Sequence, residues 1–304
     1  MMIASDNKYR PELSNDQLQR IAPAIFATSP DEQVSDRYSF IPTIDVVDGL
    51  RDAGWLPVAA QQTRANKVSR LDTNKHLVRF RHPEIEPISL NNGNLIYPEA
   101  IMFNSHDRSA AFKFLLGAFQ MLCSNGLVTG EQFGSISVRH NTKAIEDSIA
   151  ACFSLLDNTK PMMEQIDNFR QIELTDQQRH VFARSALNFK YNVHPQQLGE
   201  KPVVAYGYPS QIQTVAQKTG TDPEDVQYIP VRPEQLLTPR RREDQDHDLW
   251  TTFNVIQENV IKGGQRGYSS KYRRTTTKGV KAIDQDVKLN KALWSMAAYL
   301  GEHV

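Results

Sequence analysis

The sequence predicts an α+β protein in which an antiparallel β-meander packs on a central apolar helix and the C-terminal half is mostly helical. Three observations lead to this class. Residues 55–103 hold three short extended segments separated by turn residues, residues 109–123 carry a wide apolar stripe, and amphipathic helical patterns recur after residue 141. We therefore expect an α+β core in residues 1–140 and a helical region in residues 141–304 that packs on it.

Length and composition favour a protein that folds without covalent staples. The chain has 304 residues, of which 39% are apolar, enough for a buried core. Its two cysteines, Cys123 and Cys152, form no Cys-x-x-Cys pair, so we expect a reducing compartment and a cytoplasmic protein. The N-terminus lacks the order of a signal peptide, and no apolar run approaches the roughly 20 residues that cross a bilayer. We expect no membrane partner.

Two helices are predicted before the meander, at residues 14–28 and 43–53. The first opens with Ser14, a favoured N-cap residue, and continues with apolar residues at helical spacing. The second has Asp45 near its N-terminus, where a carboxylate is stabilised by the helix dipole, and Gly54 can adopt the left-handed conformation that ends it.

The meander is predicted to consist of Trp55–Gln62, Lys75–His82 and Asn94–Phe103. Its basic residues form a positive region with Asp72 as the one acid among them: Arg64, Lys67, Arg70, Lys75, Arg79 and Arg81. Lys75, Arg79 and Arg81 share one face, because strand side chains alternate with a period of two. Such a face could hold a nucleic-acid backbone, although exposed arginines on a sheet also serve solubility.

The apolar stripe of Ser109–Cys123 predicts the central helix, followed by a strand at Leu127–Val138. A long helical stretch is expected from Thr142 to Ile172, with a break near Pro161. Another helix is expected at Asp176–Tyr191.

Residues 192–242 contain seven prolines and predict an extended connection that encloses a short helix at Gln211–Lys218. Helical patterns return at Asp246–Ile261 and Ile283–Leu300. Between these two helices lies a basic segment, residues 262–282, which we expect to form a loop because it has many glycines and few apolar residues.

The basic segment is the candidate binding site. The whole chain has 35 basic and 35 acidic residues, whereas this segment has no acid and seven cations: Lys262, Arg266, Lys271, Arg273, Arg274, Lys278 and Lys281. Lys and Arg neutralise phosphates and release counterions, Tyr268 and Tyr272 could stack on exposed bases, and glycines let backbone amides approach a phosphate. The alternative is a solvated flexible loop that is basic without binding anything.

Catalytic and metal motifs are weak. Asn104-Ser-His-Asp107 contains nucleophile and base types, but neighbours in sequence seldom form a triad, and capping of the following helix is the favoured interpretation. The acids of Glu243–Asp248 could hold Mg²⁺, yet they precede a helix, whose N-terminus favours carboxylates. No phosphate loop or His-Glu-x-x-His motif occurs. We expect no cofactor, no metal and no catalytic residue.

Three motifs in order resemble one known family. They are Asn104–Asp107 followed by Met121-Leu-Cys-Ser-Asn-Gly-Leu127, the stretch Leu249–Gly264, and Leu289–Trp294. Together they resemble the phage/plasmid-like proteins, a family of unknown function found on bacteriophages, prophages and plasmids. In arrangement alone, helix 43–53, the basic meander and the long helix are similar to the core order of single-strand annealing proteins such as RecT and Redβ. That context implies action on DNA or on host defences.

Our first hypothesis is a homo-oligomeric protein that binds single-stranded DNA and assists annealing or recombination of mobile-element DNA. The basic segment would supply phosphate contacts and stacking rings, and Lys75, Arg79 and Arg81 would extend the track. The rival is a counter-defence protein that binds and inhibits a host defence protein. A nuclease using Asp244, Asp246 and Asp248 ranks last, so we expect a binding protein and not an enzyme.

Overall fold

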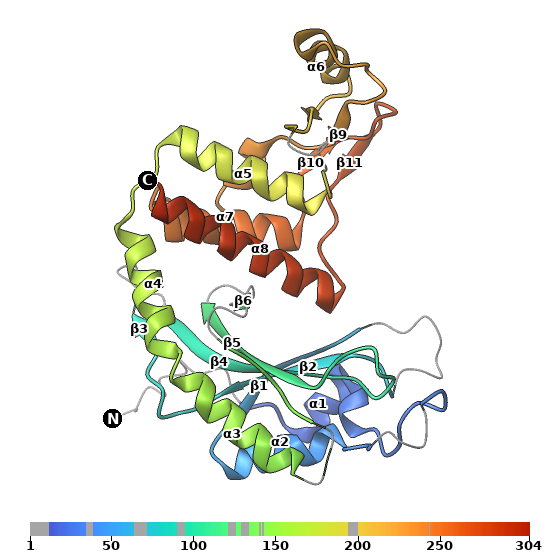
Figure 1. Ribbon diagram of the computed structural model, residues 1–304, viewed down its shortest axis with the longest axis vertical. Coiled ribbons are helices and arrows are strands. Elements are labelled where there is room, and N and C mark those ends of the chain that lie inside the picture. The colour runs from blue at the N-terminus through green and yellow to red at the C-terminus, as the bar shows by residue number, and fades with distance from the viewer. Residues whose placement is uncertain are drawn as a thin grey trace, which may run out of the picture. The chain divides into compact units, whose positions relative to one another are not determined.

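The computed structural model describes residues 12–34, 39–63, 72–89, 95–120, 126–128, 134–139, 141, 143–193, 200–242 and 244–304. The chain divides into two compact units, Met1–Met163 and Glu164–Val304 (Figure 1). The predicted class is confirmed: the first unit is built on an antiparallel sheet, and the C-terminal region is mainly helical. Within the described ranges, no helix is both long and apolar enough to span a membrane.

The sheet of unit 1 has antiparallel neighbours throughout. Its main path runs in the order β1 (Leu56–Gln62), β2 (His76–Arg81), β4 (Leu95–Asn104), β5 (Lys113–Gln120) and β6 (Gly126–Val128). In addition, β3 (Ile88–Ser89) pairs with β4, and β7 (Ser135–Ser137) pairs with β5. The three predicted meander strands are confirmed as β1, β2 and β4. Instead of one strand at Leu127–Val138, the short β6 and β7 both pair with β5, and residues 129–133 lie outside the described residues.

The expected central helix at Ser109–Cys123 is wrong, because this stretch contains strand β5. Phe114, Leu115 and Leu116 are each at most 1% exposed. Successive strand side chains point to opposite faces, so both faces of β5 are covered. A strand buried on both faces is one continuous apolar run, which periodicity cannot separate from a buried helix.

Helices cover one face of this sheet. They are α1 (Asn15–Ile21), the 3₁₀ helix η1 (Pro23–Phe26), α2 (Thr43–Asp52) and α3 (Ala144–Leu156). Ser14 and Gln17 form a capping box at the start of α1, and Pro23 ends the predicted longer helix early because proline cannot donate an amide bond. α2 and α3 pack closely at Gly49, where a Cβ would lie 2.4 Å from Cγ2 of Ile145 (Figure 1).

The long helical stretch predicted after residue 142 breaks at Asp157 and Asn158, between α3 and α4 (Thr159–Gln171). Pro161 lies in the first turn of α4, where the missing amide hydrogen has no helical acceptor to lose. The predicted break is therefore real, but it precedes the proline.

Unit 2 is built around three mutually packed helices, α5 (Asp176–Lys190), α7 (Leu249–Lys262) and α8 (Ile283–Glu302) (Figure 1). The proline-rich connection contributes short elements: strands β8 (Val204–Tyr206) and β9 (Gln227–Ile229), which pair in parallel, helix α6 (Gln211–Thr219) and the 3₁₀ helix η4 (Pro233–Leu237). Eleven of the fourteen residues of α7 are buried, so its polar side chains must find partners inside the unit.

One of those polar contacts links α7 to α8 and carries a titrating group. Gln257 of α7 donates to Asn290 of α8, and Asn290 donates to the carboxylate of Asp286 at 2.7 Å. Burial raises the pKa of Asp286 to about 6, and the hydrogen bond from Asn290 only partly opposes this.

We expect Asp286→Asn to stabilise the protein at pH 7 by on the order of 2 kcal/mol and to have little effect below pH 4. The folded state holds the Asp286 proton up to about pH 6, whereas the unfolded chain releases it near pH 4, so wild-type stability falls as the pH rises through this window. Denaturant unfolding at several pH values measures this profile. Asp284→Asn, in the same helix turn, is the matched control, and an equal gain there would contradict the assignment.

Candidate nucleic-acid interface

The basic segment is an ordered β-hairpin, so the expected irregular loop is wrong. Strand β10 (Arg266–Tyr268) pairs antiparallel with β11 (Arg274–Thr276), in the register Arg266 opposite Thr276 and Tyr268 opposite Arg274. Its ends are joined by backbone bonds from Gly264 N to Thr277 O and from Val280 N to Ile261 O, both 2.8 Å. The hairpin therefore closes directly on the last turn of α7.

The glycines of the segment serve chain packing. At Gly263, whose φ is +67°, a Cβ would lie 2.6 Å from the Thr277 carbonyl oxygen. At Gly267, a Cβ would lie 1.8 Å from the carbonyl oxygen of Pro230, so no other residue fits. The close approach that the glycines permit is thus between parts of this chain, and it explains their presence without a bound phosphate.

Main-chain contacts hold β10 against the segment that follows β9. Tyr268 N donates to Pro230 O at 3.1 Å, and the Tyr228 hydroxyl donates to Tyr268 O at 2.8 Å. Gln235 of η4 donates to Arg266 O at 2.8 Å. Three separate groups thus satisfy the outer edge of β10, and they fix the hairpin on the unit.

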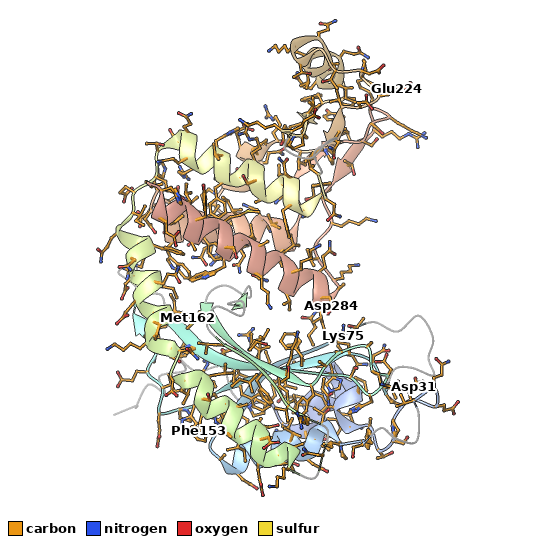
Figure 2. All side chains as sticks on the ribbon, viewed as in Figure 1. Asp31, Lys75, Phe153, Met162, Glu224 and Asp284 are labelled. Carbon is orange, nitrogen blue, oxygen red and sulfur yellow. The ribbon has the colours of Figure 1, made fainter. Side chains whose placement is uncertain are left out.

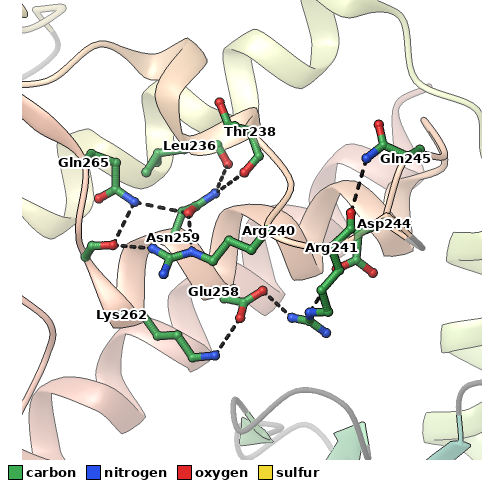
Figure 3. Close-up of polar contacts among 11 residues, drawn as sticks. Leu236, Thr238, Arg240, Arg241, Asp244, Gln245, Glu258, Asn259, Lys262 and Gln265 are labelled. Atoms are coloured by element: carbon green, nitrogen blue, oxygen red, sulfur yellow. Dashed lines mark hydrogen bonds and ion pairs between the residues drawn. The ribbon is translucent and has the colours of Figure 1, made fainter.

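A buried amide supports the base of the hairpin (Figure 3). Asn259 of α7 donates to the carbonyls of Leu236 and Thr238 at 2.9 Å each, and its oxygen accepts from Arg240 and Gln265. Arg240 also donates to the carbonyl of Gly263. This one side chain ties α7, the segment after η4 and the start of the hairpin together.

Among the described residues of unit 2, Lys262 is the predicted phosphate ligand that has a carboxylate partner. Its ammonium lies 2.6 Å from Glu258, which is 3% exposed and also pairs with Arg241 (Figure 3). Burial alone would raise the pKa of Glu258, but Lys262 and Arg241 outweigh it and hold that pKa below its ordinary value. Lys262 therefore serves this ion-pair cluster, which weakens its role as a phosphate ligand.

The remaining six cations are exposed. In the part of the chain that the structure describes, no carboxylate lies within ion-pair distance of any of them: Arg266, Lys271, Arg273, Arg274, Lys278 and Lys281. Arg266, Tyr268, Arg274 and Thr276 share one face of the hairpin, because directly opposed residues in an antiparallel pair point to the same side. This face, together with the turn that joins β10 to β11, is called the hairpin surface below.

A tyrosine that the sequence analysis missed completes the hairpin surface. Tyr208, after β8, is 49% exposed and stacks on Tyr268, with ring centroids 4.7 Å apart and 28° between the ring planes. Only an aromatic residue next to Gly207 in the proline-rich connection marked it in the sequence. The two rings form a platform beside Arg266 and Arg274, the kind of surface on which an unstacked base can lie.

Tyr272 occupies the turn in an unfavourable conformation. Its φ is +57°, the left-handed region that bulky residues seldom adopt, and its side chain is 65% exposed. Three-residue hairpin turns usually place glycine or asparagine at this position. A bulky side chain destabilises this backbone conformation, so the exposed ring of Tyr272 lowers the stability of the turn.

The basic sheet face predicted for unit 1 is wrong for two of its three residues. Arg79 and Arg81 lie on one face, as the two-residue period requires, but both pair with Glu99 of β4, at 2.6 and 2.5 Å. The side chains of Arg81 and Glu99 are 5% and 0% exposed, and the Arg81 guanidinium lies 3.6 Å from the ring centroid of Tyr97. These arginines are internal ion-pair partners and are not available to a polyanion.

The rest of that positive region belongs to unit 1 as well. Lys75 lies just before β2, so it belongs to unit 1 and not to the unit that carries the hairpin (Figure 2). Glu224, labelled in the same view, marks unit 2, where it lies between α6 and β9. Arg64, Lys67 and Arg70 lie outside the described residues. The hairpin surface is thus the candidate site that the structure supports with geometry.

The Asn104–Asp107 stretch forms a turn and caps no helix. Ala110 N donates to Ser105 Oγ at 2.8 Å, and Ser109 N donates to Asp107 Oδ1 at 2.9 Å. The His106 ring contacts Thr43 and the Ala24 carbonyl. The predicted capping of a following helix is wrong, because strand β5 follows; these side chains accept amides of the turn that leads into it.

Two of the three carboxylates of the weaker nuclease alternative, Asp244 and Asp248, have structural roles. Asp248 caps α7 by accepting from Thr251 N at 2.9 Å, and Asp244 lies 3.6 Å from Arg241. Among the residues that the structure describes, no group of three His, Cys, Asp or Glu side chains could hold a metal ion.

A cavity of about 460 Å³ in unit 1 does not suit a phosphate. The described residues that line it include the carboxylates Asp31, Glu32 and Asp72 and no lysine or arginine. These three carboxylates would repel an anionic backbone.

Fold and site together define an α+β protein whose second unit presents a supported, cation-rich β-hairpin. The chain belongs to the family described as Domain of unknown function (DUF932), whose model matches residues 31–294. It is 34% identical over 288 residues to the UPF0380 protein YfjQ and, equally, to the UPF0380 protein YafZ, both of Escherichia coli (strain K12). In each case, 95% of this chain and 91% of the relative are covered. No solved structure matches it.

The first prediction from the site concerns Glu99. Glu99→Gln should destabilise the protein by about 3 kcal/mol, because Arg79 and Arg81 lose their shared carboxylate inside the unit. The free energy of unfolding in denaturant measures the effect. Glu12→Gln removes a carboxylate that is 43% exposed and pairs with Arg51, and should cost less than about 1 kcal/mol. Similar losses in both variants would contradict the buried role.

The second prediction concerns Tyr272. Tyr272→Gly should stabilise the hairpin by about 0.5–1 kcal/mol, because glycine adopts a φ of +57° without steric cost. Hydrogen exchange of the hairpin amides reports this local stability. The neighbouring Lys271→Gly, at a position without a positive φ, should lower it instead. A loss of protection in Tyr272→Gly would show that the ring stabilises the turn.

Proposed function

We propose that this protein binds single-stranded DNA through the sugar-phosphate backbone at the hairpin surface. The observation that carries the proposal is the pairing of exposed, carboxylate-free arginines with a stacked tyrosine platform on one ordered face. Arg266 and Arg274 offer phosphate contacts on that face, and Tyr208 and Tyr268 offer a flat aromatic surface beside them.

Two physical arguments favour an unpaired strand. Arginine neutralises phosphates in any nucleic acid and releases counterions, so it supplies affinity without sequence preference. A tyrosine ring can stack only on a base that has left its own stack, which a duplex does not offer without distortion. Exposed tyrosines next to arginines therefore favour a single strand over a duplex.

In biological terms, we propose a role in annealing or recombination of phage or plasmid DNA. Such a role needs strand binding and no bond chemistry, which agrees with the structural roles of Asp244 and Asp248. Association into a homo-oligomer is part of this proposal, because an array of subunits would hold one strand along several hairpins.

Replacing Arg266, Arg273 and Arg274 together by alanine should weaken binding to a fluorescein-labelled oligo-dT by about 50-fold near physiological salt. The plot of log affinity against log salt concentration should also become shallower by about 2, since three phosphate contacts are lost. Fluorescence anisotropy over a range of salt concentrations measures both.

The matched control is Arg20, Arg139 and Lys143 to alanine, three exposed cations of unit 1 with the same change in net charge. This variant should keep wild-type affinity and salt slope. Equal weakening in both variants would remove the hairpin surface as the site. Failure of the wild-type protein to bind the oligonucleotide at low salt would overturn the proposed function and leave the counter-defence alternative.

A further inference from the structure

The outer edge of β11 carries main-chain groups that point away from the hairpin. In an antiparallel pair, hydrogen-bonded and non-bonded residue pairs alternate. Thr277 N bonds to Gln265 O and Ser269 N bonds to Arg273 O, so the intervening Gly267–Thr275 pair is in the bonded phase. Arg274 and Thr276 are therefore in the outward phase, and their N–H and C=O groups face away from β10.

The two edges of the hairpin differ in how these groups are satisfied. On β10, the outward carbonyl of Arg266 accepts from Gln235, and the N–H and C=O of Tyr268 are bonded by Pro230 and Tyr228. On β11, no partner from the described residues bonds the main chain of Arg274 or Thr276. One edge is closed by the protein itself and the other is open.

We propose that the open edge of β11 binds phosphate groups of the nucleic-acid strand through the main-chain amides of Arg274 and Thr276. This inference rests on the proposed function and adds where the backbone of the ligand lies. The two amides lie two residues apart on the same edge, about 6.8 Å along the strand, so they can serve two positions of an extended ligand. A phosphate on this edge is also within reach of the flexible Arg274 side chain.

The positive charge of the hairpin favours a phosphate over a protein strand at this edge. An open edge can also pair with a strand of another chain, and exposed cations are a common means of preventing such pairing. A second copy of this chain would bring its own hairpin cations, which have no carboxylate nearby, to the edge of β11. There the like charges would repel. A phosphate, in contrast, gains both the amide hydrogen bond and the neighbouring positive charge.

A substitution can remove one of these amides and leave the hairpin ladder intact. Proline lacks the N–H group and is tolerated on edge strands where that group faces outward. Thr276→Pro therefore deletes the proposed donor without removing any hydrogen bond of the described structure. Thr276→Val is the matched control, because it keeps the amide and loses only the hydroxyl.

Thr276→Pro should weaken binding of the full chain to oligo-dT by about tenfold, whereas Thr276→Val should bind like wild type. The salt slope should stay unchanged in both variants, since no cation is removed, which separates this effect from the arginine variants. Equal weakening by proline and valine would overturn the amide contact. Unchanged affinity of the proline variant would also overturn the amide contact, whatever the oligomeric state of that variant.

Hydrogen exchange on the wild-type protein tests the same contact without the proline substitution, and so does not depend on whether that variant folds. The Arg274 and Thr276 amides should exchange fast in the free protein and become protected when oligo-dT is added. The amides of Ser269 and Thr277, which are bonded already, should change less. Oligonucleotide binding without protection of Arg274 and Thr276 would overturn this inference and leave the proposed function standing. Absence of oligonucleotide binding would overturn both.

Discussion

The arrangement of unit 2 depends on one close approach of two backbones, between Gly267 of β10 and the carbonyl of Pro230. No side chain fits between them, and the neighbouring Tyr268 amide uses that same carbonyl as its acceptor. The contact fixes one edge of the hairpin on the segment after β9. Because that edge is closed, the cations of the hairpin and the open edge of β11 face solvent. A binding site needs such a rigid support, since a free loop would lose conformational entropy when it binds.

The polar residues of α7 follow from the same constraint. A helix that is buried on nearly every side would ordinarily be apolar throughout, yet α7 contains Gln257, Glu258 and Asn259 in succession. Each side chain bonds a different neighbour: Gln257 reaches α8, Glu258 reaches Arg241, and Asn259 reaches the chain on both sides of the hairpin base. Buried polar groups of this kind must be fully satisfied, so they specify one arrangement of the surrounding segments. Within the motif Leu249–Gly264, Asn259 and Gly263 thus support the base of the hairpin.

Local signals predicted much of this fold, and non-local pairing limited the rest. A capping residue, Ser14, located the start of α1, since a cap acts over three residues of sequence. Strand β5 was misjudged because its side chains are buried on both faces, so its apolar run carries no two-residue alternation. The shared face of Arg79 and Arg81 followed from strand periodicity, but their partner Glu99 lies 18 or more residues away on another strand. The basic composition marked the hairpin as the candidate site, whereas Tyr208 contacts it only through tertiary packing.

Two arginines on one face of a sheet therefore have opposite consequences in the two units, and the difference lies in the neighbouring carboxylate. Arg79 and Arg81 are enclosed, so their charge is neutralised within the protein by ion pairs with Glu99. Arg266 and Arg274 are solvated, so they need no partner and remain available to an incoming anion. The chain as a whole is neutral, with 35 basic and 35 acidic residues, and its field at a distance is weak. Attraction of a polyanion must then act within about one Debye length, roughly 8 Å at physiological salt, of the hairpin itself. The proposed binding at this surface would therefore depend on direct contact with its amides, guanidinium groups and stacked rings.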